Sequence, residues 1–209
     1  MSPERAARLL DAAVAAIREH ADELTALDQA IGDGDHGLNM RRGFDAIAAT
    51  REEVIALPLG QALQKAGMAL VMKVGGASGP LYGSLLMSMG KVAAEAPPDP
   101  QGLAAMLAEG VEAVKRRGKS DAGEKTMLDV LVPALGALRA GAADGLSAGD
   151  LIARVRAAAD DGLARTKDMK ATKGRASYLG ERSIGHLDPG ARSSALLIAA
   201  VCGVLAGEG

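Results

Sequence analysis

Residues 28–39 read Asp28-Gln-Ala-Ile-Gly-Asp33-Gly-Asp35-His36-Gly-Leu-Asn39, a glycine-jointed turn between two segments of helical periodicity. Three ionised carboxylates so close in sequence repel one another unless a cation lies among them. No cysteine is nearby, so the ligands are mostly oxygens, which favour Mg²⁺, Mn²⁺ or Ca²⁺ over zinc. The stretch therefore predicts a hard-cation site at Asp28, Asp33 and Asp35.

Two familiar loop motifs resemble this stretch, and neither fits it. An EF-hand loop starting at Asp33 would place Leu38 where the turn glycine belongs and Phe44 where the bidentate glutamate belongs. Residues 32–37 match the glycine pattern of a dinucleotide-binding loop, but a helical pattern precedes them where that motif needs a strand. We therefore expect any phosphate at this turn to be met through metal ions.

The composition predicts one all-helical domain spanning residues 1–209. Alanine and leucine dominate, and the only aromatic residues are one Phe and two Tyr, which suits closely packed helices. Apolar residues recur at helical spacing in eight blocks, roughly 3–27, 37–55, 59–73, 79–94, 100–117, 124–140, 147–166 and 189–206. Ser147 and the Asp188-Pro189 pair are typical helix N-terminal signals. We expect an eight-helix antiparallel bundle or barrel.

Charge and hydropathy exclude several functional classes. The net charge is -2 and no basic run exceeds Lys115-Arg116-Arg117, so nucleic-acid binding is not expected. The single cysteine, Cys202, lies in the apolar run 195–206, where it is expected in the core and the run is too short to span a bilayer. The N-terminus opens into an amphipathic helix and does not resemble a signal peptide, which predicts a cytoplasmic protein without a membrane anchor.

Four loops are richer in glycine or polar residues than turning requires, and alternate connections of an antiparallel array lie at the same end. We therefore expect one site built from loops 32–39, 75–80, 118–126 and 173–190. Backbone N–H groups and the Ser78 hydroxyl suit phosphate oxygens at a helix start, although a plain helix-helix turn is the alternative. Met127 suits packing against a purine, although a methionine at such a position is more often part of the core. His36 suits a metal or a phosphate, with a purely structural imidazole as the alternative.

Arg175 and Arg182 lie in the one long stretch without helical periodicity, residues 167–188. A planar guanidinium there suits a phosphoryl group that gains charge during transfer. The structural alternative is an arginine that ties the loop to a helix C-terminus.

Several motifs in chain order resemble the nucleotide-binding L subunits of dihydroxyacetone kinases. They are Asp28-x-x-Ile-Gly-Asp33-Gly-Asp35-His36-Gly-x-Asn39, Gly-Gly-Ala77-Ser78-Gly-Pro, Gly-Glu-Lys-Thr-Met127, and Gly-Arg175-Ala-Ser-Tyr-Leu-Gly-Glu-Arg-Ser-Ile-Gly-His-x-Asp188-Pro-Gly. The resemblance implies an eight-helix antiparallel barrel with a nucleotide at one end and two Mg²⁺ ions on the three aspartates. It implies nucleotide contacts at His36, Gly37, Leu38, Asn39, Ala77, Ser78, Gly118, Met127, Arg175, Asp188, Pro189 and Gly190.

The resemblance also implies a place in a relay of phosphoryl groups. In one form of this machinery a longer chain consumes ATP; in the other, a separate subunit keeps ADP bound, a phosphohistidine on the M subunit recharges it, and the ATP phosphorylates dihydroxyacetone held by the K subunit. A chain without a substrate domain resembles the second form, with Arg175 stabilising the transferred phosphoryl. Two alternatives stay open: an ATP-consuming kinase subunit for a related ketose or another small hydroxylated substrate, and a non-catalytic helical nucleotide or metal-binding regulatory module. A homodimer also stays open.

Overall fold

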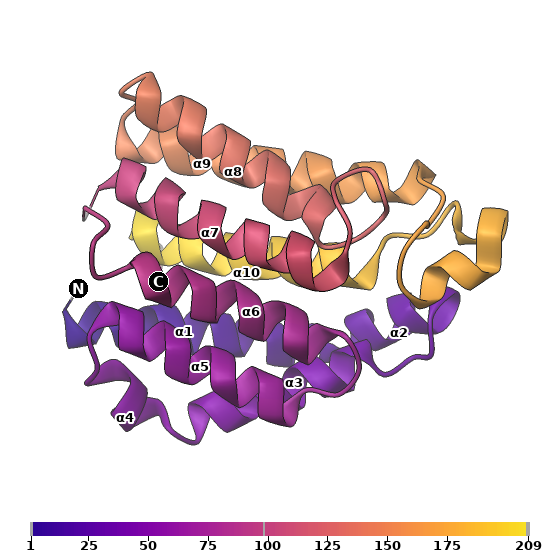
Figure 1. Cartoon of the computed structure of the whole chain (residues 1–209), viewed down its shortest axis with the longest axis horizontal. Helices are drawn as coiled ribbons and strands as arrows, with labels where there is room; N and C mark the ends of the chain where they lie inside the picture. Colours follow the sequence, from indigo (N-terminus) through magenta and orange to yellow (C-terminus); the bar gives the residue numbers. More distant parts are fainter. Residues whose placement is uncertain (1, 98, 208–209) are drawn as a thin grey trace.

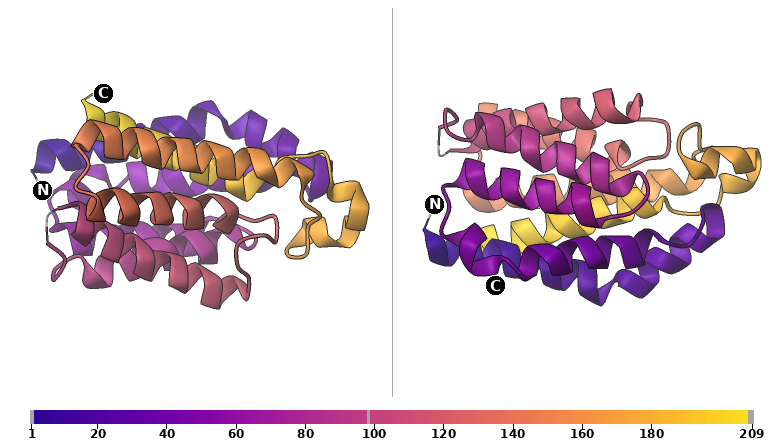
Figure 2. Two further views of the ribbon diagram at one scale, coloured as in Figure 1. Left: turned by 90° about the horizontal axis from the view of Figure 1, so that it is seen from above. Right: turned by 60° about the horizontal axis from the view of Figure 1, so that its bottom comes forward.

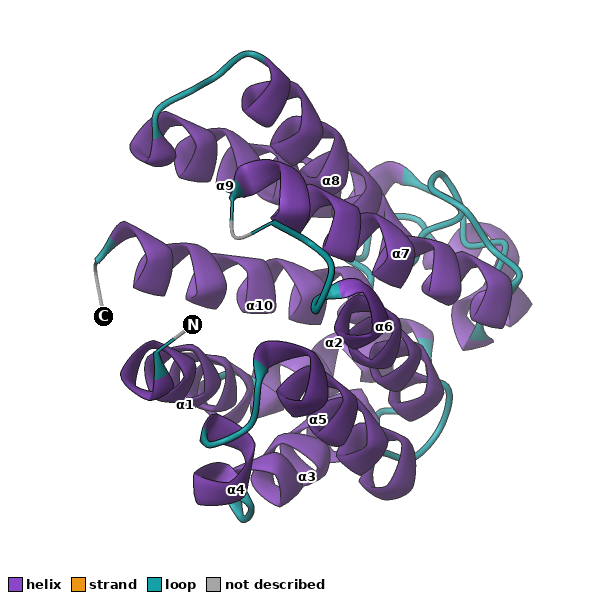
Figure 3. Cartoon of the chain, turned by 60° about the vertical axis from the view of Figure 1, so that its left-hand side comes forward, coloured by secondary structure: helices purple, strands orange, loops and turns teal. Residues whose placement is uncertain are grey.

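The computed structural model describes residues 2–97 and 99–207, which form helices joined by turns, with no strand among them. Figure 3 shows this helical make-up. The elements are α1 (Pro3–Glu19), α2 (Ala21–Ile31), α3 (His36–Ala48), α4 (Arg51–Ile55), α5 (Leu59–Lys73), α6 (Ser78–Val92), α7 (Pro100–Gly118), α8 (Leu128–Ala143), α9 (Ala148–Arg165), α10 (Pro189–Ala206) and two 3-10 segments, η1 (Thr166–Asp168) and η2 (Arg175–Ser183).

Eight of these helices close into a barrel. In ring order, each packs against the next: α1, α3, α5, α6, α7, α8, α9, α10 and back to α1. The predicted all-α, eight-helix architecture is therefore confirmed, with α2 and α4 as additions to the ring. Figure 1 shows most of these helices running side by side along the long axis of the molecule.

Two of the eight predicted blocks are divided. The block 3–27 is interrupted at His20, which ends α1 and precedes α2, and the block 37–55 is interrupted between α3 and α4. The block expected from residue 124 starts later, at Leu128, because the Asp129 carboxylate accepts the N–H groups of Gly123 and Thr126 and holds this segment as a turn. The predicted N-terminal caps are confirmed: the Ser147 side chain accepts the N–H of Asp150, and that of Asp188 accepts the N–H of Ala191.

The core fills the barrel mainly with aliphatic side chains. Its largest cluster takes residues from nearly every ring helix, among them Val14, Met40, Phe44, Leu70, Tyr82, Val111, Leu128 and Leu196. Helices α5 and α6 approach closely through glycines, since a Cβ placed on Gly83 would lie 2.8 Å from the Gly67 carbonyl oxygen. This close approach fixes α6, and hence its N-terminus, against the neighbouring helix.

Helix α10 corrects one expectation about length. The apolar run 195–206 was expected to be too short to span a bilayer, but the helix that contains it begins at Pro189 and its 18 residues suffice by length and composition alone. Of these 18 residues, 44% are buried inside the protein, and the helix packs against α1 and α9. Cys202 on this helix is buried, as predicted. A helix that forms part of a protein core meets the same criterion.

The loops predicted to converge do lie together. The α2–α3, α5–α6 and α7–α8 connections and the segment around η2 gather at one end of the barrel, and both chain termini lie at the other (Figures 1 and 2). The three aspartates and the residues of the long final motif therefore share one end of the molecule.

Candidate functional site

Three carboxylates form a compact cluster at the loop end. Asp28 lies in the last turn of α2, and Asp33 and Asp35 lie in the turn before α3. One oxygen from each carboxylate lies within 4.8 Å of the others, with Asp28 buried and the other two exposed. The cluster predicted from sequence is thus assembled by the fold.

Asp28 organises the turn as well as contributing charge. Its Oδ2 accepts the backbone N–H of Asp35 at 2.9 Å and that of His36 at 3.1 Å. A Cβ placed on Gly32 would lie 2.0 Å from Asp28 Oδ1, so a side chain there would displace the carboxylate. Gly34 adopts a φ of +75°, a left-handed conformation that glycine adopts at little cost. The glycines of the motif therefore let the chain fold back over Asp28.

The cluster fits a hard divalent cation. Its donors are carboxylate oxygens, and Asp33 and Asp35 are exposed to solvent. A cation is already paired with the cluster, since Arg175 Nε lies 2.9 Å from Asp33 Oδ2. One positive side chain, 142 residues away in the sequence, thus pairs with the cluster.

The His36 side chain joins three helices. Its Nδ1 lies 3.0 Å from Ser78 Oγ at the start of α6, and its Nε2 lies 2.9 Å from Ser193 Oγ in the first turns of α10. Burial lowers the pKa of His36, although the charges of Asp28 and Asp35 oppose this. Both ring nitrogens are therefore engaged within the protein, and the imidazole is favoured in its neutral form.

The hydrogen-bond network continues to Tyr82, which sequence reasoning did not single out. Its hydroxyl lies 2.7 Å from Ser193 Oγ and 2.8 Å from Ser194 Oγ, and it donates to the Gly190 carbonyl at 3.2 Å. Burial raises the pKa of Tyr82 to about 12, so the phenol stays protonated. Two adjacent serines, Ser193 and Ser194, in a mostly apolar helix were the available sequence signal.

Several helices begin beside the aspartate cluster. Helix α3 starts at His36 and α6 at Ser78, and the His36 ring bonds them to α10, which starts at Pro189. Helix α8 starts close by, since a Cβ on Gly190 would lie 3.6 Å from Met127 N. Helix N-termini carry unpaired N–H groups and partial positive charge, which together favour anions. The site thus combines a cation-binding cluster with an anion-binding surface.

A buried lysine, Lys125, holds together the segments that lead into these helices. Lys125 is 1% exposed, and its ammonium donates to the carbonyls of Thr166 and His186. Burial lowers its pKa, opposed by the surrounding aspartates. Burial also raises the pKa of Asp188 to about 7, with Asp129 adding to the rise and Lys125 opposing it. Lys125 therefore ties the α7–α8 turn to the end of α9 and to the segment before α10.

The remaining residues expected at the site lie around this centre in different ways. A Cβ on Gly37 would lie 1.9 Å from the Ala21 carbonyl, so Gly37 serves the packing of α3 on α2. Asn39 lies beside the turn before α6, since a Cβ on Gly75 would be 2.9 Å from Asn39 Oδ1. Leu38 is 45% exposed.

Three further residues expected at the site lie at helix ends. Ala77 caps α6, and Gly118 ends α7 with its Cβ position 3.4 Å from Leu81 of α6. Met127 precedes α8 and is 4% exposed within the main core cluster, which agrees with the core alternative for its side chain.

Comparison with known proteins places the sequence in a family. The DAK2 domain profile matches residues 30–203, which include Asp33 and Asp35 of the cluster, the His36 network and most of α10. The chain belongs to the DAK2 domain family.

Among curated relatives, the ADP-binding subunit DhaL of PEP-dependent dihydroxyacetone kinase 1 from Listeria innocua is 50% identical over 185 residues, which cover 88% of each chain. The ADP-binding subunit DhaL of the PEP-dependent dihydroxyacetone kinase from Escherichia coli is 43% identical and covers 83% of each chain. A solved structure, the dihydroxyacetone kinase of C. freundii with AMP-PNP and Mg²⁺, has a TM-score of 0.72 and 27% identity, covering 94% of this chain and 33% of that one.

Proposed function

We propose that this DAK2 chain is the ADP-binding subunit of a phosphoenolpyruvate-dependent dihydroxyacetone kinase. It accepts a phosphoryl group from a phosphohistidine donor subunit onto bound ADP and passes it to dihydroxyacetone held by a K subunit. The observation that carries the proposal is the three-carboxylate cluster beside the starts of α3, α6 and α10. The full-length relatives named as ADP-binding subunits support it.

Asp28, Asp33 and Asp35 would hold two Mg²⁺ ions, and the N–H groups at the starts of α3 and α6 would bind the diphosphate. Bound Mg²⁺ neutralises and orients phosphate oxygens during transfer. Asp28 keeps the turn in place through its two backbone hydrogen bonds. The neutral His36 fixes the helix starts relative to one another, and an uncharged ring there leaves the cluster's negative charge for the metal.

Arg175 is the proposed catalytic residue. Its guanidinium pairs with Asp33 but is 68% exposed, so it has room to reach a phosphoryl group at the open side of the cluster. Phosphoryl transfer depends mainly on positioning and charge neutralisation, and this chain therefore needs no nucleophile of its own. The group that accepts the substrate's hydroxyl proton belongs, in this proposal, to the K subunit.

The same end of the barrel is where the partner subunits would dock. Leu38, Tyr178 and Ile184 border it and are 45%, 88% and 44% exposed. Exposed apolar residues grouped near a functional site are typical of interaction surfaces. We propose that the K and M subunits use this end in turn, in the cytoplasm, and a homodimer stays a prediction.

An ATP-consuming kinase subunit for a related ketose is the second candidate. The observation that favours it is the likeness to a longer kinase solved with AMP-PNP, an ATP analogue. Both candidates use the same aspartates and helix starts, and they differ in whether the nucleotide leaves after each turnover.

Native mass spectrometry of the purified chain separates these candidates. Retention of ADP with two Mg²⁺ ions, followed by its phosphorylation when a phosphorylated M subunit is added, is the expected result. An empty chain that turns over ATP with its K partner would favour the second candidate. A chain that binds no nucleotide would overturn both and leave a regulatory module as the remaining reading.

A further inference from the structure

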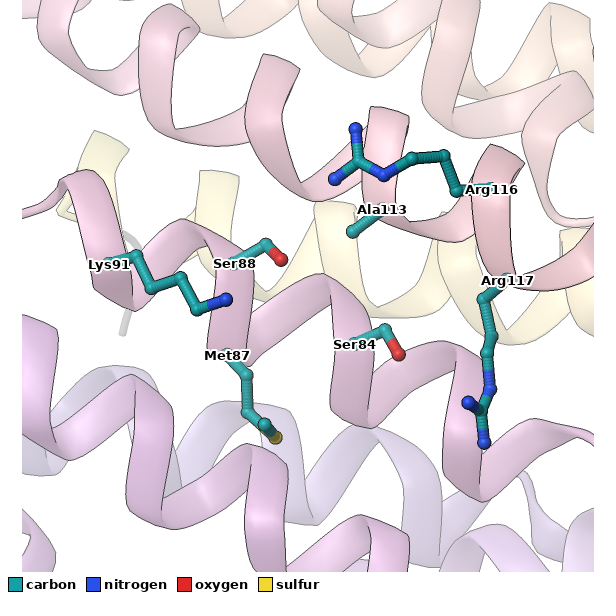
Figure 4. Close-up of a pocket in the computed structure, with 7 residues that line it drawn as sticks. All are labelled: Ser84, Met87, Ser88, Lys91, Ala113, Arg116 and Arg117. Atoms are coloured by element: carbon teal, nitrogen blue, oxygen red, sulfur yellow. The ribbon is translucent and has the colours of Figure 1, made fainter.

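A groove lies between α6 and α7, away from the aspartate cluster. Its volume is about 360 Å³, and Ser84, Met87, Ser88 and Lys91 line it from α6. Arg116 and Arg117 line it from the last turns of α7, as Figure 4 shows. Nothing in the proposed phosphoryl transfer uses this groove.

The groove is positively charged although the whole chain carries a net charge of -2. Its lining includes three basic side chains and no acidic one. Arg116 pairs with Glu109 at 3.1 Å, whereas Lys91 and Arg117 have no ion-pair partner in the described part of the chain. Two uncompensated positive charges therefore face one small concave surface.

Hydrogen-bond donors accompany these charges. Ser84 and Ser88 are four residues apart on α6, so they lie on the same face of the helix. Ser88 is 7% exposed, and among the described residues neither hydroxyl has a hydrogen-bond partner. Figure 4 shows the Lys91 side chain running along the groove toward Ser88 and Met87. Basic side chains and hydroxyls without a partner in the protein can donate hydrogen bonds to phosphate oxygens, and the groove is large enough to hold a small ligand.

We propose that the α6–α7 groove binds a small phosphate-bearing anion, separate from the nucleotide. Arg117 and Lys91 supply the charge from opposite sides, and the serine hydroxyls donate to the remaining oxygens. The volume lies at the lower end of the range for small-molecule sites, which fits a phosphate monoester of a few carbons better than a nucleotide. A ligand there would bridge the helix that begins at Ser78 and the helix that ends at Gly118.

Amide NMR of the full chain tests this site directly. Methyl phosphate is the probe, titrated at constant ionic strength into the chain with and without saturating Mg²⁺ and ADP. We expect saturable shifts of the Ser84, Ser88 and Ala113 amides under both conditions, because the groove is separate from the aspartate cluster. Shifts confined to the loop end, or linear shifts without saturation, would overturn the proposal.

A matched pair of variants assigns the binding to the groove. Lys91→Met combined with Arg117→Met should weaken methyl phosphate binding at least tenfold and leave the thermal unfolding curve close to that of the parent, since both side chains are exposed. Arg139→Met removes an exposed charge from α8, outside the groove, and should change the affinity less than twofold. Equal losses in the two proteins would show a general charge effect and refute a site.

Discussion

Replacing Asp33 by asparagine separates binding from folding at the aspartate cluster. The Asp33 side chain is 36% exposed, and its partner Arg175 is 68% exposed. Exposed ion pairs contribute about 0–1 kcal/mol to stability. Without metal, the free energy of unfolding of Asp33→Asn should therefore lie within about 1 kcal/mol of that of the parent.

Metal and nucleotide binding should respond far more strongly. The three carboxylates lie within 4.8 Å of one another, so an ion among them is at most about that far from Asp33. At that separation the attraction between a divalent ion and one carboxylate is about 2 kcal/mol in a water-like dielectric and about 7 kcal/mol at an effective dielectric of 20. Taking the lower value as a floor, the loss of one charge weakens Mg²⁺ binding at least about tenfold.

The assay is calorimetric titration of Mg²⁺ and ADP, with urea unfolding of the metal-free protein alongside. Asp45→Asn is the matched control, because Asp45 is also an exposed aspartate with an arginine partner, Arg18, but lies outside the cluster. The control should bind like the parent. An Asp33→Asn protein that binds Mg²⁺ and ADP within twofold of the parent would refute the carboxylate cluster as the metal site.

Three further outcomes follow from the same geometry. Arg175→Ala should retain ADP, and it should bind Mn²⁺ alone at least as tightly as the parent, because the competing guanidinium no longer pairs with Asp33. Phosphoryl transfer, measured with the partner subunits, should slow. An unchanged transfer rate would make Arg175 structural. Lys125→Met leaves two buried carbonyl groups without their donor, so the free energy of unfolding should fall by about 2–4 kcal/mol and hydrogen exchange should rise in residues 166–188; unchanged exchange there would contradict its role as a tie. The pKa of Asp188 is raised to about 7 by burial, so the unfolded chain ionises first and the group's contribution to stability falls as pH rises from about 4 to 7. Relative to Asp188→Asn, the free energy of unfolding of the parent, measured with urea, should fall by at most about 4 kcal/mol between about pH 4 and 7. If this free energy changed with pH in parallel for the two proteins, the raised pKa would be contradicted.

Local patterns were sufficient for much of the fold. Helical periodicity located eight blocks that correspond to the ring, and short-range chemistry marked where α9 and α10 begin, because a cap needs only its own side chain and an N–H three residues away. The metal cluster was visible for the same reason, since its three aspartates occur within eight consecutive residues. The breaks at His20 and after Ala48 were missed because no glycine or proline marks them.

The sequence by itself thus determined the helices, the caps of α9 and α10, and the cluster of aspartates that favours a bound cation. Only the tertiary structure decided that His36 bonds to Ser78 and Ser193, 42 and 157 residues away, and that Lys125 is buried beneath the loops. Such pairings depend on how each helix is rotated about its axis when the ring closes, and periodicity along one helix does not specify that rotation relative to distant helices. The charged groove between α6 and α7 has the same origin, because Lys91 and Arg117 face a common space only after those helices pack.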